Sequence, residues 1–297
     1  MDPATPRQRI LVTGAAGMLG RDLVPLLARR HEVIAADLAE FDVTDPDACE
    51  RFVGRAKPDV GVHGAAFTRG DQCEIDRDVA FRVNAQAPGH VARACRLAGA
   101  RMVHVSTDYV FDGKKDGPYV EEDRPAPASV YGESKWQGEV AVTRELSSGP
   151  GFAILRTAWL FGPHGPNFVE TILRLAAERE SLAVVEDQRG CPTYTVDLAG
   201  AIRAVVETGA RGVYHAVGAG EITWRGFAVE ILRRSGIAKE VRPLTTAELN
   251  RPAPRPANSV LSTEKLRRAT GYAFRDWRDA LAEYLARPER RAARDPS

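Results

Sequence analysis

The sequence has few cysteines, no long apolar run and no excess of charge of either sign. Its cysteines are Cys49, Cys73, Cys95 and Cys191. They are scattered without a Cys-x-x-Cys pair, which argues against a disulfide framework or a zinc site. No stretch approaches the ~20 apolar residues that a membrane helix requires, and residues 1–8 lack the apolar core of a signal peptide. Together these absences predict a soluble, cytoplasmic protein.

The charges nearly cancel, because 41 lysines and arginines stand against 40 aspartates and glutamates. This balance predicts neither a nucleic-acid nor a membrane partner. One basic cluster, Arg287 to Arg294, lies among prolines in a terminal segment, and we expect a disordered tail over residues 288–297 rather than a binding arm. The six histidines show no metal-ligand spacing and no Ser-His-Asp context, so we predict no metal and no hydrolase.

The first half of the chain alternates short apolar runs with helical patterns, which is typical of βαβ units and a parallel sheet. Strands are expected at Ile10–Thr13, Glu32–Ala36, Val60–Gly64, Met102–Ser106 and Ala153–Arg156, and helices at Leu19–Arg30, Pro46–Ala56, Val79–Leu97 and Tyr131–Glu145. Right-handed crossovers make this an α/β fold with a doubly wound parallel (Rossmann) sheet. We expect residues 1–160 to form a domain that binds NAD or NADP.

The pattern loosens in the second half, where we expect a smaller α/β lobe over residues 161–287 that binds the substrate, with some segments returning to the main sheet. Helices are expected at Asn167–Glu180, Val196–Thr208, Trp224–Ser235, Thr263–Thr270 and Asp276–Ala286, and strands at Leu182–Val185 and Gly212–Val217. The proline-rich stretch 251–256 cannot form a regular helix or strand.

Candidate ligand-binding residues follow five of the predicted strands, at the point where each strand ends. They are Gly14, Asp37, Ala65, Thr107 and Trp159. Because the carboxyl ends of parallel strands share one edge of an open α/β sheet, and ligands bind at that edge, we expect these residues to converge.

A glycine-rich loop, Gly14 to Gly20, joins the first strand to the first helix with Gly-x-x-Gly-x-x-Gly spacing. Gly14 permits the tight turn, Gly17 lets the backbone approach a pyrophosphate at the helix N-terminus, and Gly20 lets the helix pack on the sheet. The remaining residues predicted to bind the cofactor are Met18, Leu19, Asp37, Asp42, Val43, Ala65, Ala66 and Thr68. The alternative is a tight turn without a ligand.

Asp37 ends the second strand, where a carboxylate can bind ribose hydroxyls and repel a 2′-phosphate. This favours NAD over NADP, although nearby arginines could offset the repulsion. The alternative is an ordinary turn residue at a strand end.

Thr107, Tyr131 and Lys135 have the chemistry of a ketoreductase. A phenol can protonate a carbonyl oxygen as hydride reaches the carbon, an ammonium can lower the pKa of that phenol, and a hydroxyl can polarise the same oxygen. Tyr131 and Lys135 are one helical turn apart and share a face. The alternatives are an exposed amphipathic helix for Tyr131 and Lys135, and a backbone contact at the strand end for Thr107.

Two further observations favour the catalytic interpretation. Only six of the 41 basic residues are lysines, so a lysine at position 135 suits a site that needs a compact ammonium. Gly138 lies on the face of Tyr131 at a cost in helix propensity, which we interpret as room for a ligand.

These motifs resemble the extended short-chain dehydrogenases/reductases, and within them the dTDP-4-dehydrorhamnose reductase family. The resemblance extends from the glycine loop through the runs 106–113 and 130–139 to the second-half runs 156–162, 187–193 and 255–259. It implies that NADPH or NADH reduces the 4-keto group of dTDP-4-dehydro-L-rhamnose. Tyr131 would donate the proton, Lys135 would hold the nicotinamide ribose, and Thr107 would bind the keto oxygen.

The resemblance also implies that Asp108 and Trp159 face the hexose and that the protein is a homodimer. From the residues alone, two interpretations of Asp108 are equal: it forms a turn, or it accepts a hydrogen bond from a sugar hydroxyl. From the residues alone, Trp159 is interpreted as a core aromatic. The stretch His63 to Ala66 departs from the Asn-Ala-Ala-Ala usual in relatives. Some relatives hold magnesium at an interface, for which only Asp22 and Asp197 are candidates here, so we predict no metal.

Three other functions fit the same motifs. A 4-ketoreductase for a different nucleotide deoxysugar would differ in only a few pocket contacts. A nucleotide-sugar epimerase or dehydratase shares the Tyr–Lys pair but recycles tightly bound NAD. A non-catalytic regulatory subunit that binds a dinucleotide is built on the same fold.

Overall fold

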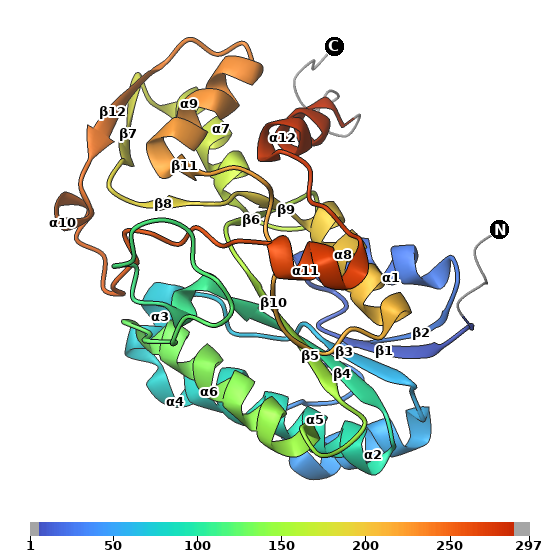
Figure 1. The fold of residues 1–297 in the computed structure, drawn as a ribbon. Coiled ribbons are helices and arrows are strands. Elements are labelled where there is room, and N and C mark those ends of the chain that lie inside the picture. The colour runs from blue at the N-terminus through green and yellow to red at the C-terminus, as the bar shows by residue number, and fades with distance from the viewer. Residues whose placement is uncertain (1–5, 288–297) are drawn as a thin grey trace.

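The computed structural model describes residues 6–287 and contains a six-stranded parallel sheet in the order β10-β5-β4-β3-β1-β2 (Figure 1). Its strands are β1 (Arg9–Thr13), β2 (Glu32–Ala36), β3 (Val60–His63), β4 (Arg101–Thr107), β5 (Phe152–Thr157) and β10 (Gly212–His215). The sheet predicted from the alternating pattern is confirmed, and β10 joins it from the second half of the chain. The expected tail, 288–297, lies outside the described residues.

The chain changes direction across the sheet at β1, because β2 pairs with one side of β1 and β3 with the other. Loops that leave β1 and β3 therefore diverge and leave a crevice at the carboxyl ends of these strands. Gly14 follows β1 with φ +70°, and a Cβ there would lie 2.7 Å from the Ala65 backbone nitrogen after β3. Glycine at position 14 thus lets the two loops start side by side at the base of the crevice, before they diverge.

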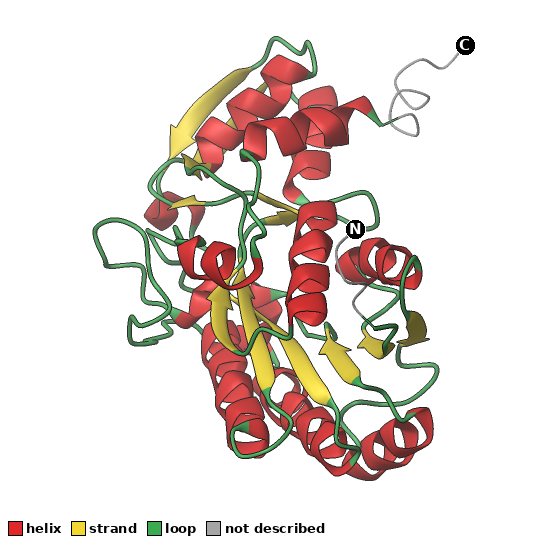
Figure 2. Cartoon of the chain, turned by 45° about the vertical axis from the view of Figure 1, so that its right-hand side comes forward, coloured by secondary structure: helices red, strands yellow, loops and turns green. Residues whose placement is uncertain are grey.

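Helices cover both faces of the sheet (Figure 2). One face packs against α1 (Met18–Ala28) and α8 (Thr195–Thr208) around Ile10, Leu23 and Leu198. The other face lies against α2 (Pro46–Ala56), α5 (Ala87–Leu97) and α6 (Val130–Leu146), with Leu11, Val91 and Met102 in a second apolar core. α11 (Glu264–Thr270) packs beside α8 and β10. Burial on both faces explains why these strands have nearly continuous apolar sequences.

The helix expected at 79–97 begins earlier and contains an irregular turn. α3 (Gly70–Ile75) and α4 (Arg77–Phe81) lead into a π-helical turn, η1 (Arg82–Gln86), and then α5. Asn84 in this turn bonds the backbone of Phe67, at 2.8 Å from its nitrogen and 2.9 Å to its oxygen, and donates to Ser134 Oγ at 3.2 Å. The π turn therefore aims Asn84 at α6 and at the loop after β3.

Gly138 serves this helix contact rather than a ligand. A Cβ at position 138 would lie 2.2 Å from the Asn84 carbonyl oxygen and 3.3 Å from Pro88. The interpretation of Gly138 as room for a ligand was wrong, because α5 and the π turn fill that space.

The rest of the second half forms a smaller lobe above the carboxyl ends of the strands (Figure 1). It contains α7 (Phe168–Glu178), α9 (Trp224–Arg234), α12 (Trp277–Ala286), the short α10 (Thr246–Leu249), and three two-stranded pairs. The pairs are β7 (Ser181–Val185) with β12 (Glu240–Leu244), β6 (Leu160–Phe161) with β9 (Thr193–Tyr194), and β8 (Arg189–Gly190) with β11 (Ile222–Thr223). Phe161, Phe227 and Trp277 centre a separate apolar core there. The domain division at residue 160 stays a prediction.

Candidate active site

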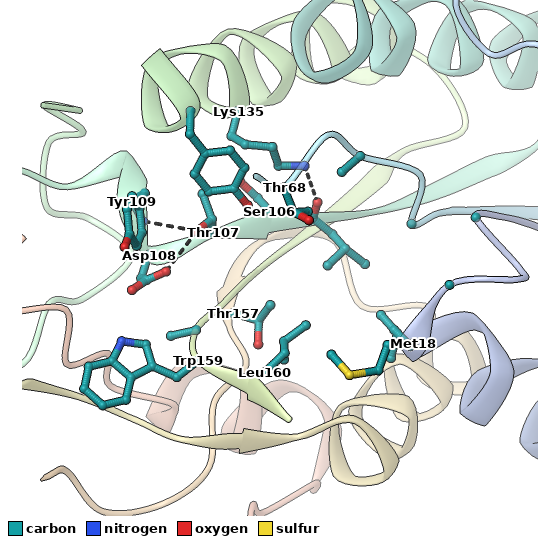
Figure 3. Close-up of a pocket in the computed structure, with 18 of the residues that line it drawn as sticks. Met18, Thr68, Ser106, Thr107, Asp108, Tyr109, Lys135, Thr157, Trp159 and Leu160 are labelled. Carbon is teal, nitrogen blue, oxygen red and sulfur yellow. Dashed lines mark hydrogen bonds between the residues drawn. The ribbon is translucent and has the colours of Figure 1, made fainter. Parts of the chain in front are cut away.

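A cavity of about 570 Å³ lies at the carboxyl ends of β1, β3, β4 and β5 and is closed on its far side by residues of the smaller lobe. Figure 3 shows Thr107 and Lys135 on one side of it, with Trp159, Leu160 and Met18 on the opposite side. The predicted site residues that line it are Gly14, Gly17, Met18, Leu19, Gly20, Ala66, Thr68, Thr107, Asp108, Tyr131, Lys135 and Trp159. Its size suits a small-molecule ligand.

The helix that follows the glycine loop presents the backbone N–H groups of its first turn to this cavity. Gly17 is the N-cap of α1 and no side chain caps that helix end. A Cβ at Gly20 would lie 2.4 Å from the Gly14 oxygen, so glycine is required for the helix to start this close to the strand. The uncapped N–H groups and the positive end of the helix dipole suit the pyrophosphate of a dinucleotide.

Four residues predicted to bind the cofactor do not line the cavity: Asp37, Asp42, Val43 and Ala65. Asp37 accepts a hydrogen bond from the Ala16 nitrogen at 2.9 Å and from the Leu38 nitrogen at 2.9 Å, so its carboxylate braces the glycine loop. Asp42 accepts from the nitrogen and the hydroxyl of Thr44, both at 2.8 Å. Val43 packs against the core under the sheet.

Tyr131 and Thr107 meet at the end of β4. Thr107 Oγ1 donates to Asp108 Oδ1 at 2.9 Å and accepts from the Tyr109 nitrogen at 3.2 Å. Ser129 caps α6 by accepting from the Gly132 nitrogen at 3.1 Å, which starts the helix next to Tyr131. Burial raises the pKa of Tyr131 and hydrogen bonding with Thr107 opposes this. Burial, rather than the charge of Lys135, therefore dominates the pKa shift of Tyr131. The raised pKa keeps the phenol protonated, as a proton donor requires.

Lys135 is buried, with 2% of its surface exposed, so it is not a solvated lysine on an amphipathic helix. Its Nζ donates to the Val105 carbonyl at 2.7 Å, which points it at β4 between the glycine loop and Thr107 (Figure 3). Burial lowers the pKa of Lys135 to about 8, against a raising effect of Glu139.

Asp108 has a buried carboxylate with a free acceptor. Its Oδ2 has no hydrogen-bond partner within the described residues, and the residue lines the cavity. Burial raises the pKa of Asp108 to about 6, while hydrogen bonds from Thr107 and Ser259 lower it. A ligand hydroxyl would satisfy this oxygen.

Trp159 does not stand alone. Its ring stacks on Trp224, with centroids 3.4 Å apart and planes 5° apart. A Cβ at Gly190 would lie 2.5 Å from Trp159 Cε2, so glycine is needed beside its edge. Trp159 therefore contributes to a two-ring wall rather than forming an isolated platform.

Sequence reasoning missed the residues that the smaller lobe adds to the cavity: Pro166, Phe168, Trp224, Ala253 and Arg255. Arg255 Nη2 donates to Asp71 Oδ1 at 3.0 Å and its Nη1 to the Ala253 oxygen at 2.8 Å. Among residues 6–287, Arg255 and Lys135 are the two cationic side chains that line the cavity. No local sequence pattern indicates that Trp224 lines a cavity. Arg255 lies inside a proline-rich loop, and a charged residue in such a loop is a signal that could have indicated a binding role.

The stretch that departs from the usual pattern of relatives places His63 behind the site. Its Nδ1 lies 2.7 Å from Thr13 Oγ1, and its ring stacks on His104 at 5.4 Å. Burial, helped by the charge of Lys135, lowers the pKa of His63 to about 3. The same two causes also lower the pKa of His104. Both rings are therefore neutral.

The two carboxylates considered for a metal have partners within the chain. Asp22 accepts from Thr195 Oγ1 at 2.5 Å, and Asp197 pairs with Arg275 at 2.9 Å. Within residues 6–287 no three histidine, cysteine or carboxylate side chains cluster as metal ligands. No helix in the same range is long and apolar enough to cross a membrane.

The doubly wound sheet, the glycine loop, and the buried Lys135 one helical turn after the half-buried Tyr131 are typical of the short-chain dehydrogenase/reductase class. Residues 8–290 match the family described as the RmlD substrate binding domain, and the chain belongs to that family.

Relatives within the family cover nearly the whole chain. A dTDP-4-dehydrorhamnose reductase from Streptomyces griseus is 44% identical over 94% of this chain and 93% of its own length. A probable dTDP-4,6-dihydroxy-2-methyloxan-3-one 4-ketoreductase from Streptomyces antibioticus is 45% identical over 97% of both. A dTDP-4-dehydrorhamnose reductase from Bacillus anthracis, solved in complex with NADP, superposes with a TM-score of 0.89 at 36% identity, over 94% of this chain and 99% of that one.

Proposed function

We propose that this protein reduces the 4-keto group of dTDP-4-dehydro-L-rhamnose to dTDP-L-rhamnose with NADPH or NADH. The observation that carries the proposal is the placement of Thr107, Tyr131 and Lys135 in one cavity with the glycine loop. The names of the relatives from Streptomyces griseus and Bacillus anthracis support the same reaction.

The residues of the cavity divide into a cofactor side and a substrate side. Gly14, Gly17 and Gly20 would hold the pyrophosphate, and Lys135 would hold the nicotinamide ribose. When bound, the dinucleotide supplies a hydride to the keto carbon. Asp37 braces the glycine loop and does not line the cavity, so it gives no preference for NADH, and the NADP complex of the Bacillus anthracis relative supports NADPH as a cofactor.

Proton transfer would be the work of Tyr131. Its phenol donates a proton to the developing alkoxide, and the Thr107 hydroxyl would turn from Asp108 Oδ1 to donate a hydrogen bond to the same oxygen. Lys135 stabilises the phenolate that is left. On the other side of the hexose, the unpaired Asp108 Oδ2 would accept from a sugar hydroxyl and Trp159 would pack on the ring.

Arg255 supplies a cation for the substrate diphosphate. It lines the cavity on the segment that the smaller lobe contributes, and Asp71 also accepts hydrogen bonds from Arg251 and the Ala253 nitrogen in that segment. Bidentate guanidinium groups suit phosphate oxygens.

A 4-ketoreductase for another deoxysugar is the second candidate, because the Streptomyces antibioticus relative is as similar to this chain as the rhamnose enzymes are. The two candidate functions can be distinguished by incubating the protein with NADPH and, in turn, dTDP-4-dehydro-L-rhamnose and dTDP-4,6-dihydroxy-2-methyloxan-3-one. A kcat/KM at least tenfold higher for dTDP-4-dehydro-L-rhamnose supports the proposal, and the reverse ratio assigns the other sugar.

An epimerase or a regulatory subunit would behave differently in two simple measurements. An epimerase retains NAD through purification, so its denatured supernatant contains the nucleotide. A regulatory subunit binds the dinucleotide without oxidising it. The buried Lys135 and the half-buried Tyr131 favour catalysis over a regulatory role.

We also infer that the enzyme acts in the cytoplasm as a homodimer. The four cysteines are free and buried, which suits a reducing compartment. The dimer follows from the resemblance to the family, and sedimentation equilibrium would test it.

A further inference from the structure

A buried carboxylate lies one helical turn after Lys135 on α6. Glu139 is 1% exposed, and it accepts from Arg156 Nη2 at 2.7 Å and Arg156 Nε at 3.0 Å. Ser106 Oγ donates to the same carboxylate at 2.5 Å. Ser106 and Arg156 are opposite each other in the pairing of β4 with β5. One side chain therefore ties the catalytic helix to two adjacent strands directly beneath the cavity.

The surroundings of Lys135 give this carboxylate an electrostatic role. His63 on β3 and His104 on β4 are neutral, and Val105 offers a carbonyl. Tyr131 on α6 is protonated, Asp108 follows β4, and Arg156 on β5 is paired with Glu139. Burial lowers the pKa of Lys135, and Glu139 is the group that raises it. An ammonium in this position is stable only if a nearby negative charge compensates its lost hydration.

We propose that Glu139 is a positioning residue that holds Lys135 in its ammonium form and fixes α6 on β4 and β5. Arg156 in turn forms a buried ion pair with Glu139 at 2.7 Å, and its guanidinium lies 5.1 Å from the Phe111 ring centroid and 6.0 Å from that of Trp136. The proposal rests on the proposed function, because Lys135 matters to catalysis there as a cation.

A purely structural role predicts something different. Apolar residues of similar volume often replace a buried ion pair without loss of stability. Such a replacement could anchor α6 to the sheet, but it could not compensate the charge of Lys135. The protonation of Lys135 therefore distinguishes the two roles.

The test is a direct titration of Lys135 by NMR in protein labelled with carbon-13 at the lysine Cε. The chain contains only six lysines, and Lys135→Met assigns the signal. We expect the wild-type signal to titrate near pH 8. Loss of the opposite charge in Glu139→Gln leaves Arg156 unbalanced and lowers this pKa by about one unit or more.

The double variant Glu139→Met with Arg156→Met keeps the test valid where Glu139→Gln does not fold. It removes the carboxylate and the guanidinium together, so Lys135 titrates between the wild type and Glu139→Gln. Glu133→Gln is the matched control: it lies on the same helix, but its carboxylate accepts from Gln137 Nε2 at the surface, at 2.9 Å. We expect no shift for it.

A Lys135 pKa that stays within about 0.3 unit of wild type in a folded Glu139 variant overturns the proposal. With substrate, the high-pH limb of kcat should move to lower pH in the same variants and not in Glu133→Gln. The NMR titration needs neither cofactor nor substrate, so it can succeed where the assignment of the reaction fails. In that outcome Glu139 still sets the charge of Lys135, but for another reaction.

Discussion

The catalytic assignment depends most directly on Tyr131. In Tyr131→Phe the hydroxyl disappears and the ring stays, so packing against Tyr109, at a ring distance of 5.6 Å, is kept. Loss of a general acid should lower kcat by about 10²–10⁴-fold. Dinucleotide affinity, measured by fluorescence titration, should stay within about twofold. Equal loss of affinity and of folded protein would show a structural role instead.

Asp108 should cost the unliganded protein stability at neutral pH. Its pKa in the folded protein, about 6, exceeds the ordinary 3.8, so the folded state holds this proton more tightly. Stability therefore falls as the pH rises from about 4 to about 6 and stays reduced above that. Asp108→Asn removes the effect and should gain about 2–3 kcal/mol at pH 7.5 relative to its difference from wild type at pH 4.

Urea unfolding of both proteins at the two pH values measures this. If the unfolding free energy of Asp108→Asn differs from that of wild type by the same amount at pH 4 and pH 7.5, the interpretation of Asp108 as a destabilising buried charge is wrong. A lower affinity for the ketosugar in the stabilised variant would indicate that the cost serves binding.

At the scale of single residues, the sequence motifs predicted most of the residues that line the strand-end side of the cavity. Thr107, Tyr131 and Lys135 were recognisable from spacing, because a helical turn and a strand end fix where they point. Trp224 and Arg255 were not, because they reach the cavity only through the packing of the smaller lobe. Asp42 accepts a hydrogen bond from the Thr44 nitrogen in its own turn and does not line the cavity. Sequence spacing cannot distinguish a turn residue of this kind from one that binds a ligand.

Among the elements, the contact between α6 and the π turn positions the helix that carries Tyr131 and Lys135. Gly138→Ala would place a Cβ 2.2 Å from the Asn84 oxygen. Because this atom is backbone, the helices must separate, and we expect a loss of about 1–3 kcal/mol in unfolding free energy. Gly54→Ala on α2 is the matched control, since nothing lies within 4 Å of its Cβ. It should gain about 0.5–1 kcal/mol from helix propensity.

Denaturant melts of the two variants measure both changes. A neutral Gly138→Ala would mean that the contact is loose and that α6 is positioned by other groups.

Long periodic elements were predictable, and short ones were not. The sheet strands agree with the apolar runs because a strand that is buried on both faces has apolar residues at nearly every position. β12 contains Pro243 and two charged residues and lacks alternation, so no strand was expected there. The π turn has no sequence signature, because it depends on the contacts of Asn84 with Phe67 and Ser134.

The cavity belongs to the whole molecule, because the strand ends supply one wall and the smaller lobe the other. Asp71 on α3 joins them by accepting from Arg251 at 2.9 Å, from Arg255 at 3.0 Å and from the Ala253 nitrogen at 3.2 Å. Topology rules predicted the sheet edge, but the path of the proline-rich segment over it depends on these long-range contacts.

Arg255→Met should raise the KM for the dTDP-sugar about 10–100-fold and change kcat by less than about threefold, because a charge-assisted bond to phosphate is lost before chemistry begins. Arg251→Met is the matched control, since Arg251 shares Asp71 but does not line the cavity. Steady-state kinetics of both variants decide this, and equal effects would remove Arg255 from substrate binding.

The central claim is a stoichiometric reduction of a dTDP-ketosugar. The most direct test follows the absorbance of the reduced nicotinamide after mixing the protein with NADH or NADPH and dTDP-4-dehydro-L-rhamnose made in situ. We predict that one reduced dinucleotide is consumed for each dTDP-L-rhamnose formed, and that Tyr131→Phe abolishes most of the reaction. A protein that binds the dinucleotide but oxidises none of it in the presence of this sugar would contradict the account.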